Sequence, residues 1–130
     1  MSPPLFLLEV VLQQTSTLLL VGKPGHLRDA LAGVLADHPL VCADSGPHAL
    51  KAAHESSPAL TVLGPGLPQP EIPALVSQLK SVLPRAACLV LADFDEDRQR
   101  ALCAGADAVI SCNVTAVSLL ALVNSLIAGG

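Results

Sequence analysis

Aromatic side chains are nearly missing from this chain of 130 residues, which has two phenylalanines and no tryptophan or tyrosine. Charged residues are scarce as well, at 14% of the chain, against roughly 25% in ordinary soluble domains. A hydrophobic core must therefore be built from leucine, valine and alanine, and few charges remain to cover the outside. We expect part of the apolar surface to meet a partner, and the length predicts a single domain.

Basic residues are also few. The chain has seven lysines and arginines, scattered along its length, and a formal net charge of −4. A nucleic-acid-binding module would gather its basic residues on one face or along one helix. We therefore expect no direct binding of nucleic acid by this chain.

The four cysteines (Cys42, Cys88, Cys103 and Cys112) form no C-x-x-C pair. No cationic segment precedes the first apolar run, so the sequence does not resemble a secretory signal, and we expect a cytoplasmic protein with reduced, mostly buried cysteines. Residues 108–130 carry no charge and are long enough for a membrane span. Because serine, asparagine and threonine interrupt this stretch, we expect no membrane partner.

From residue 17 onward, short apolar runs alternate five times with segments of helical periodicity. This βα alternation predicts a parallel sheet covered by helices on both faces. Residues 1–16 form an apolar extension, and residues 17–130 form the domain. The predicted strands are 17–21, 41–43, 59–63, 87–91 and 108–111; the predicted helices are 27–37, a segment from Pro47, 74–82, 93–105 and 114–128.

The third predicted strand organises the rest of the chain. It stops at Gly64, and the following Pro65-Gly66 and Pro68 predict a rigid turn. In an open parallel sheet, ligands bind outside the carboxyl ends of the strands. A glycine at that place offers no reactive side chain.

The chain from residue 17 resembles the receiver domains of response regulators in two-component signalling. The sequence marks of this resemblance are Leu19-Leu20-Val21, residues 27–31, residues 59–63, Leu67-Pro68 and the run Ala101-Leu102-Cys103-Ala104-Gly105-Ala106-Asp107. The last run is very typical of the family. The resemblance implies an α/β fold of the flavodoxin-like (βα)5 type, a three-layer sandwich with parallel strand order 2-1-3-4-5. The ending Ile127 to Gly130 is similar to receivers that precede a DNA-binding helix-turn-helix module.

The chain departs from this family at the positions that carry its chemistry. Gly22 and Lys23 stand where two acidic residues hold Mg²⁺, Gly64 where the phosphorylated aspartate stands, Ala92 where a threonine or serine binds the phosphoryl group, Cys112 where a lysine pairs with it, and Val109 where an aromatic residue reports the state of the site.

These departures remove the groups that phosphotransfer requires. Mg²⁺ prefers oxygen ligands that include carboxylates, and without a carboxylate nucleophile no acyl phosphate forms at that position. Lys23 adds a positive charge near the place of the metal. We therefore expect a degenerate receiver that is not an enzyme and holds neither a metal nor a cofactor.

The aspartates that follow the fourth predicted strand allow two interpretations. Asp93, Asp95 and Asp97 have the spacing that opens a calcium loop, but Arg98 stands where the loop glycine belongs. We instead expect a solvated helix start, in which Asp93 and Glu96 match the acid-x-x-Glu capping pattern.

Other reactive residue types give no firm motif. Cys112 is either a buried filler of the core or a reactive thiol whose pKa is lowered by Lys23. Residues 22–25 lack the phosphate-binding frame of a P-loop. We expect His26, His38, His48 and His54 to be surface or capping residues.

The final helix is apolar on more than one face. Val117, Leu120, Val123 and Ile127 could face the sheet, and Leu119, Leu122 and Leu126 would then point outward. Two interpretations stay open: residues 5–12 of the same chain cover this second face, or a second copy does so in an isologous homodimer. In the resembled family, the usual dimer face includes this helix, so we predict a dimer through Leu119, Leu122 and Leu126 with help from Phe6 in the extension.

We therefore expect a non-phosphorylatable signalling module that acts through contact with proteins, as the input domain of a transcriptional response regulator. The alternative is a sensor of a small ligand or anion, with Lys23 as the anion contact in the emptied crevice. Other regulatory partners also remain possible.

Overall fold

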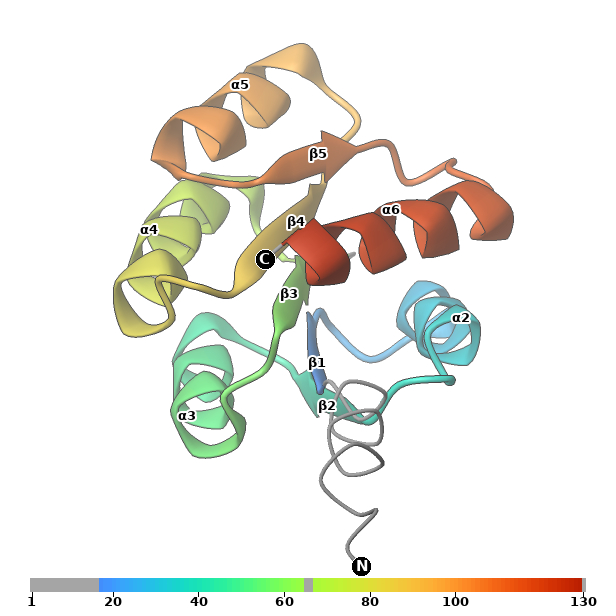
Figure 1. Cartoon of the computed structure of the whole chain (residues 1–130). Helices are drawn as coiled ribbons and strands as arrows, with labels where there is room; N and C mark the ends of the chain where they lie inside the picture. The colour runs from blue at the N-terminus through green and yellow to red at the C-terminus, as the bar shows by residue number, and fades with distance from the viewer. Residues whose placement is uncertain (1–16, 65–66, 130) are drawn as a thin grey trace, which may run out of the picture.

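The computed structural model describes residues 17–64 and 67–129 of the chain. It contains one five-stranded sheet in the order β2-β1-β3-β4-β5 with every neighbouring pair parallel, as predicted. Figure 1 shows the sheet between two layers of helices. The strands are β1 (Leu18–Val21), β2 (Leu40–Ala43), β3 (Leu60–Leu63), β4 (Ala87–Leu91) and β5 (Ala108–Ile110).

Five α-helices and one short 3₁₀ helix connect the strands. In Figure 1, α2 and α6 lie on one side of the sheet and α3, α4 and α5 on the other. The helices are α2 (His26–Val34), α3 (Gly46–Ser56), η1 (Gln69–Glu71), α4 (Ile72–Val82), α5 (Asp95–Ala104) and α6 (Ala116–Gly129).

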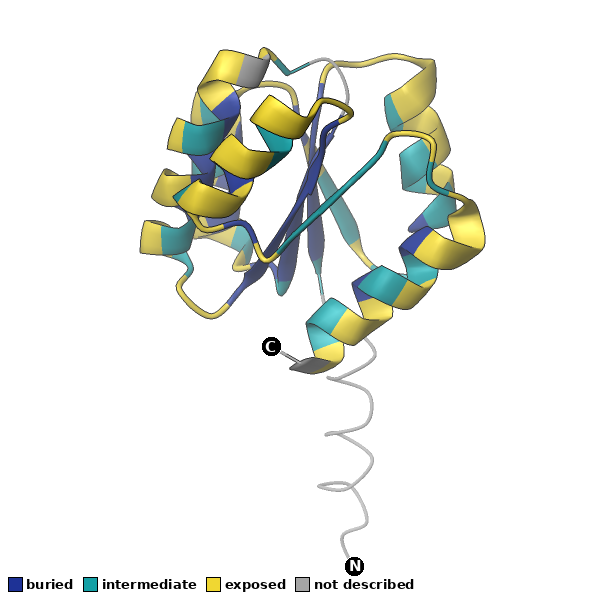
Figure 2. Cartoon of the chain, turned by 90° about the horizontal axis from the view of Figure 1, so that it is seen from above, coloured by how far each residue is buried: buried dark blue, intermediate teal, exposed yellow. Residues whose placement is uncertain are grey.

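The core consists of two aliphatic clusters, one on each face of the sheet. Alternate side chains of a strand point to opposite faces, so Leu19 and Val21 pack towards α3 and α4, whereas Leu18 and Leu20 pack towards α2 and α6. Strands β1, β3 and β4 are buried at every position, which Figure 2 shows as a dark central layer between mostly exposed helices. Among the described residues of the core, Thr61 is the one buried residue with a polar side chain.

Helix boundaries agree with the sequence patterns at some ends and differ at others. Gly105 ends α5 with a φ of 118°, a left-handed conformation that glycine adopts without strain. Helix α3 begins at Gly46 rather than Pro47, because Ser45 accepts a hydrogen bond from the His48 amide as an N-cap. Helix α6 begins at Ala116 rather than Val114, because the Thr115 hydroxyl accepts a hydrogen bond from the Ser118 amide.

The prediction of mostly buried cysteines is wrong. Only Cys88 is buried, whereas Cys42, Cys103 and Cys112 are exposed. These three lie on a sheet-edge strand, on the outer part of a helix and in a connection, respectively. At these places the position in the fold decides the exposure, and burying one small thiol would gain too little free energy to change it.

Two predictions concern residues outside the described part of the chain. These are the apolar extension of residues 1–16, with Phe6, and the rigid turn at Pro65-Gly66. Within the described ranges, no helix has the length and apolar character needed to cross a membrane, and the most apolar helix, α6, has 14 residues.

The central strands should dominate stability. Leu89 in β4 is fully buried, so we expect Leu89→Ala to lower the free energy of unfolding by about 2–5 kcal/mol. Leu102→Ala is the matched control, because Leu102 lies on α5 with 45% of its surface exposed. Urea unfolding of both variants measures the difference; equal losses would contradict the assignment of β4 to the core.

Candidate functional site

The carboxyl edge of the sheet brings several of the predicted site positions together. Gly22, Gly64 and Ala92 directly follow β1, β3 and β4, and all three are buried. Their amides continue the strand pairing: the Gly64 amide donates to the Val21 carbonyl at 2.7 Å, and the Ala92 amide donates to the Ile110 carbonyl at 2.9 Å. Lys23 and Cys112 lie next to this edge but are exposed.

Aliphatic side chains close the space over Gly64. A Cβ atom at this glycine would lie 3.4 Å from Leu31 Cδ1, 3.4 Å from the Val21 carbonyl oxygen and 3.7 Å from Leu20 Cδ1. A methyl group would just fit at van der Waals distance. A carboxylate would have to displace Leu31 of α2 or lie against apolar groups, where it loses its hydration. The crevice predicted from the sequence is therefore not hollow at its centre.

An arginine that the sequence reasoning overlooked holds the end of β1. Arg28 Nη1 donates to the Gly22 carbonyl oxygen at 3.2 Å and forms an ion pair with Asp44 Oδ1 at 2.5 Å. The Arg28 side chain is only 18% exposed. The end of β1 therefore already has a cationic partner, which comes from α2. The possible signal in the sequence was an arginine at the start of one helix and an aspartate after the neighbouring strand.

Asp93 does not cap α5, so the prediction of a capping box is wrong. The N-cap residue is Phe94, and α5 begins without a side-chain cap. Instead, Asp93 Oδ1 accepts hydrogen bonds from the Ser111 hydroxyl and the Cys112 amide, both at 2.9 Å. These bonds hold the pKa of Asp93 below its ordinary value, with the Cys112 amide as the largest cause. Asp93 thus ties the end of β4 to the connection between β5 and α6.

Asp44 and Asp93 are too far apart to share a metal ion. Asp44 follows β2 and Asp93 follows β4, and three strand spacings of the sheet separate these strands by about 14 Å. Within residues 17–64 and 67–129, no group of three or more histidine, cysteine or acidic side chains is placed to hold a metal. Both carboxylates are also already engaged by neighbouring groups.

The thiol of Cys112 is neither a buried filler nor an activated nucleophile. Cys112 is exposed, and partial burial, followed by the negative charge of Asp93, raises the pKa of its thiol. The prediction that Lys23 lowers this pKa is therefore wrong. Burial also raises the pKa of Cys88 to about 12, which makes that thiol inert. Lys23 itself is exposed, and its role as an anion contact stays a prediction.

The run that ends in Asp107 is structural and lies away from this edge. Asp107 Oδ2 accepts hydrogen bonds from the Cys88 amide at 2.7 Å and from Lys80 Nζ at 3.0 Å. Lys80 also donates to the Ala86 carbonyl oxygen at 3.0 Å. These contacts join the start of β5 to β4 and α4, so the most family-typical run explains the fold and contributes nothing to chemistry at the strand ends.

The predicted partner face on α6 needs a correction. Leu119 is only 2% exposed and packs in the core with Val123, because residues four apart share one face of a helix. Val117, predicted to face the sheet, is instead 79% exposed. Leu122 and Leu126 are half-buried at the margin of the same cluster. The switch position Val109, in the edge strand β5, is also half-buried.

Comparison with known proteins identifies the fold. No protein-family model matches the sequence, and no curated protein matches it. Solved structures of response-regulator receiver domains match most of the chain. A two-component response regulator from Clostridium difficile has a TM-score of 0.78 at 16% identity, over 87% of this chain and 96% of the other.

Two further structures agree with this fold. The receiver domain of NtrX from Brucella abortus has a TM-score of 0.76 at 24% identity, over 87% of this chain and 99% of that one. A LuxR-family two-component response regulator from Aurantimonas sp. SI85-9A1 has a TM-score of 0.74 at 17% identity, over 88% of this chain and 86% of that one. The predicted flavodoxin-like receiver fold is confirmed.

The hydrogen bonds of Asp93 predict a specific dependence of stability on acid. Because the folded-state pKa of Asp93 is below its ordinary value of 3.8, its stabilisation is complete above 3.8 and is lost as pH falls through the folded-state pKa. We expect Asp93→Asn to remove this part of the acid dependence, and Asp95→Asn, on the first turn of α5, to retain it. Urea unfolding at pH values above and below 3.8 measures the acid dependence of stability, and carboxyl ¹³C titration by NMR measures the pKa of Asp93. A titration of Asp93 at or above 3.8 would contradict the assignment.

Proposed function

We propose that this domain is a signalling module with a receiver fold that does not accept a phosphoryl group and acts by contact with other proteins. The observation that carries the proposal is the packing over Gly64. Leu31 and Leu20 occupy the space beside the end of β3, where an acyl phosphate would need a carboxylate, a metal and room for the transferred group.

The charges at the same edge support this proposal. Arg28 donates a hydrogen bond to the Gly22 carbonyl oxygen at the end of β1 and forms an ion pair with Asp44. Asp93 is held by two donors from the connection between β5 and α6. Asp44 and Asp93 therefore both have structural partners, and this arrangement favours a fixed edge over a phosphotransfer centre.

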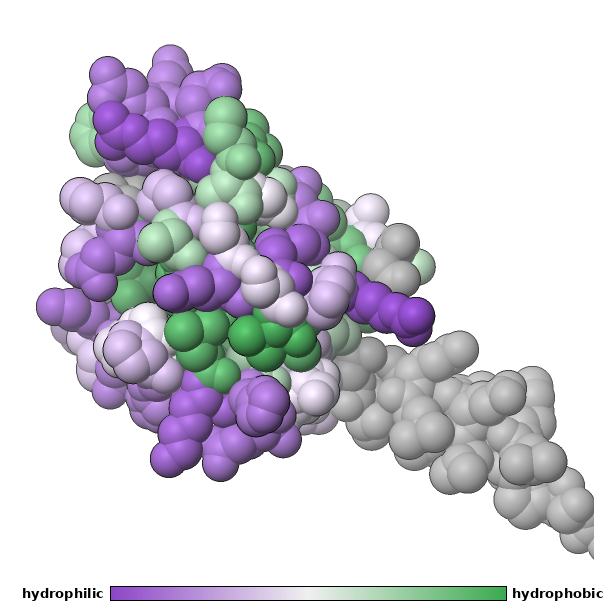
Figure 3. Space-filling model, turned by 90° about the vertical axis from the view of Figure 1, so that its left-hand side faces the viewer, coloured by the Kyte–Doolittle hydropathy of each residue, from purple (hydrophilic) through white to green (hydrophobic). Residues whose placement is uncertain are grey.

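We further propose that α6 contributes to an isologous dimer. Residues 108–129 carry no charge, and β5, the strand that precedes this helix in the chain, is an edge strand of the sheet. Val117 exposes 79% of its surface, and Leu122 and Leu126 are half-buried. A second copy would cover these side chains with the same surface of its own. Figure 3 shows that the opposite layer, with α3, α4 and α5, is mainly polar with separate apolar patches.

The wider setting is a proposal that rests on the fold. We place the domain in the cytoplasm, as the input part of a two-component-type regulator of transcription. The support is its similarity to receiver domains, one of which belongs to a LuxR-family response regulator. The net charge of −4 supports contact with protein rather than with nucleic acid.

Acetyl phosphate with Mg²⁺ tests the phosphotransfer part of the proposal. We expect no phosphoryl adduct in the intact mass of the full chain, while an active receiver treated in parallel gains one. Gly64→Asp should also gain no adduct and should lower the free energy of unfolding by about 2 kcal/mol or more, because its carboxylate is desolvated. Gly64→Ala should change it by about 1 kcal/mol at most.

A stable adduct on the unmodified chain would overturn this part of the proposal. If Gly64→Asp were as stable as Gly64→Ala, the packing argument at Gly64 would be wrong even without an adduct.

Sedimentation equilibrium tests the dimer. We expect the unmodified chain to be a dimer at high micromolar concentration, and Val117→Lys to weaken association at least tenfold, because the variant buries a charge in an apolar interface. Val82→Lys is the matched control, since Val82 is an exposed apolar residue on α4 in the opposite layer. A monomer at high micromolar concentration, or equal weakening by both variants, would exclude a dimer through α6.

A further inference from the structure

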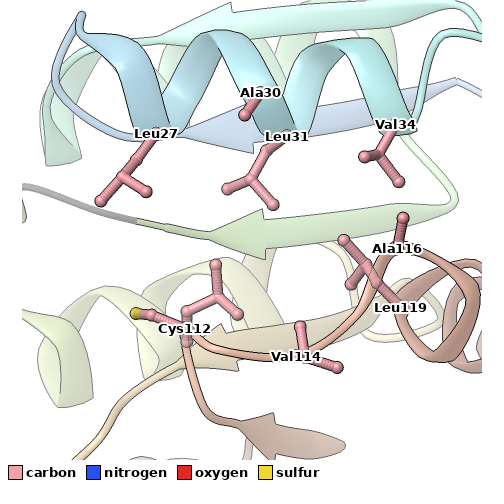
Figure 4. A pocket seen from close by; sticks show the side chains of 9 residues that line it. Leu27, Ala30, Leu31, Val34, Cys112, Val114, Ala116 and Leu119 are labelled. Atoms are coloured by element: carbon pink, nitrogen blue, oxygen red, sulfur yellow. The ribbon is translucent and has the colours of Figure 1, made fainter.

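A small apolar pocket, partly open to solvent, lies between α2 and the connection from β5 to α6; it is called the cavity below. Its volume is about 140 Å³. Figure 4 shows side chains of α2 pointing towards side chains of the opposite wall. Helix α2 contributes Leu27, Leu31 and Val34, and the connection after β5 contributes Cys112 and Val114.

The chemistry of the lining selects a neutral occupant. All lining side chains are aliphatic except that of Cys112, and none carries a charge. Partial burial and Asp93 raise the pKa of this thiol, so the thiol stays protonated at neutral pH. Water in this pocket finds few polar groups on its walls, so an apolar molecule can displace it at little cost. A charged ligand would lose its hydration without gaining a counter-ion.

The size of the cavity also limits the occupant. An enclosed apolar cavity of about 150 Å³ holds one benzene molecule, and this pocket has a similar volume but is open to solvent beside the exposed Leu27 and Cys112. Two exposed alanines, Ala30 and Ala116, form part of the walls. These small side chains leave open a volume that larger ones would fill. The helices do not require alanine there, because leucine has nearly the same helix propensity.

We propose that this cavity binds a small, neutral, apolar molecule of about the size of benzene or toluene. The site lies beside the ends of the strands, because Leu31 both lines the cavity and covers Gly64. This inference is independent of the absence of phosphotransfer. A failed titration would leave the acetyl phosphate result unchanged, and a phosphoryl adduct would leave the titration unchanged.

Toluene and benzoate are suitable probes, because they have similar shapes and differ in charge. In ¹H–¹⁵N NMR titrations of the full chain, we expect toluene to cause saturable shifts centred on Leu31, Val114 and Leu119. A ligand of this size should bind with a Kd on the order of 1 mM. Benzoate at the same concentrations should cause no saturable shift at these residues.

Variants that fill the cavity complete the test. Ala116→Leu should weaken toluene binding at least tenfold, and Ala121→Leu should leave it unchanged, because Ala121 is exposed on the same helix and does not line the cavity. If Ala116→Leu fails to fold, Ala30→Leu fills the space from the opposite wall. The proposal is overturned if toluene causes no saturable shift, if the shifts map elsewhere, if benzoate binds equally well, or if the filled variants keep the affinity.

Discussion

A parallel sheet has to be covered on both faces, and the rest of this structure depends on that constraint. Strands β1, β3 and β4 are buried at every position, and leucine, valine and alanine provide nearly all of the covering side chains. The two core clusters use alternate residues of the same strands, so each strand joins both layers. With so few charged residues, the domain obtains its stability from the area and close packing of aliphatic groups.

The same packing continues past the ends of the strands. In most open α/β sheets, the crevice at the carboxyl edge is the place for ligands. Here Leu31 packs over Gly64, and the polar groups at the edge form pairs that join neighbouring segments. Arg28 links α2 to the ends of β1 and β2, and Asp93 links the end of β4 to the connection after β5. An edge with these contacts is a structural joint, and an aliphatic pocket lies beside it.

The sequence patterns predicted the elements well where the pattern and the burial agree. The bounds of β4, the parallel pairing and the glycine that ends α5 follow from a continuous apolar run, from βα alternation and from the conformational freedom of Gly105. The strand order came from the resemblance to receiver domains. The predicted phase of α6 was right for Val123 and wrong for Val117 and Leu119. The better signal was the helix's few polar residues, because Ser118, Asn124 and Ser125 are all exposed and bound the face that points away from the sheet. The packing of Leu119 and Val123 in the core fixes the same orientation of the helix.

The contacts at the site were harder to predict, because they join residues that are distant in sequence. The local pattern at Asp93 and Glu96 matched a helix cap, yet the donors that Asp93 uses lie 18 and 19 residues further along. The pair of Arg28 and Asp44 spans 16 residues and requires neighbouring strand ends. Such pairs depend on the finished sheet, which local sequence patterns do not describe.

The lack of charge on α6 has a kinetic consequence. Proteins with complementary charged surfaces accelerate their encounter by long-range attraction, and added salt slows that encounter. A surface built from Val117, Leu122 and Leu126 has no such attraction to offer. A protein that associates there gains no steering from this surface itself, so we expect a rate on the order of 10⁵–10⁶ M⁻¹s⁻¹. Two copies of this chain each carry a net charge of −4, so added salt should speed their encounter slightly by screening their repulsion.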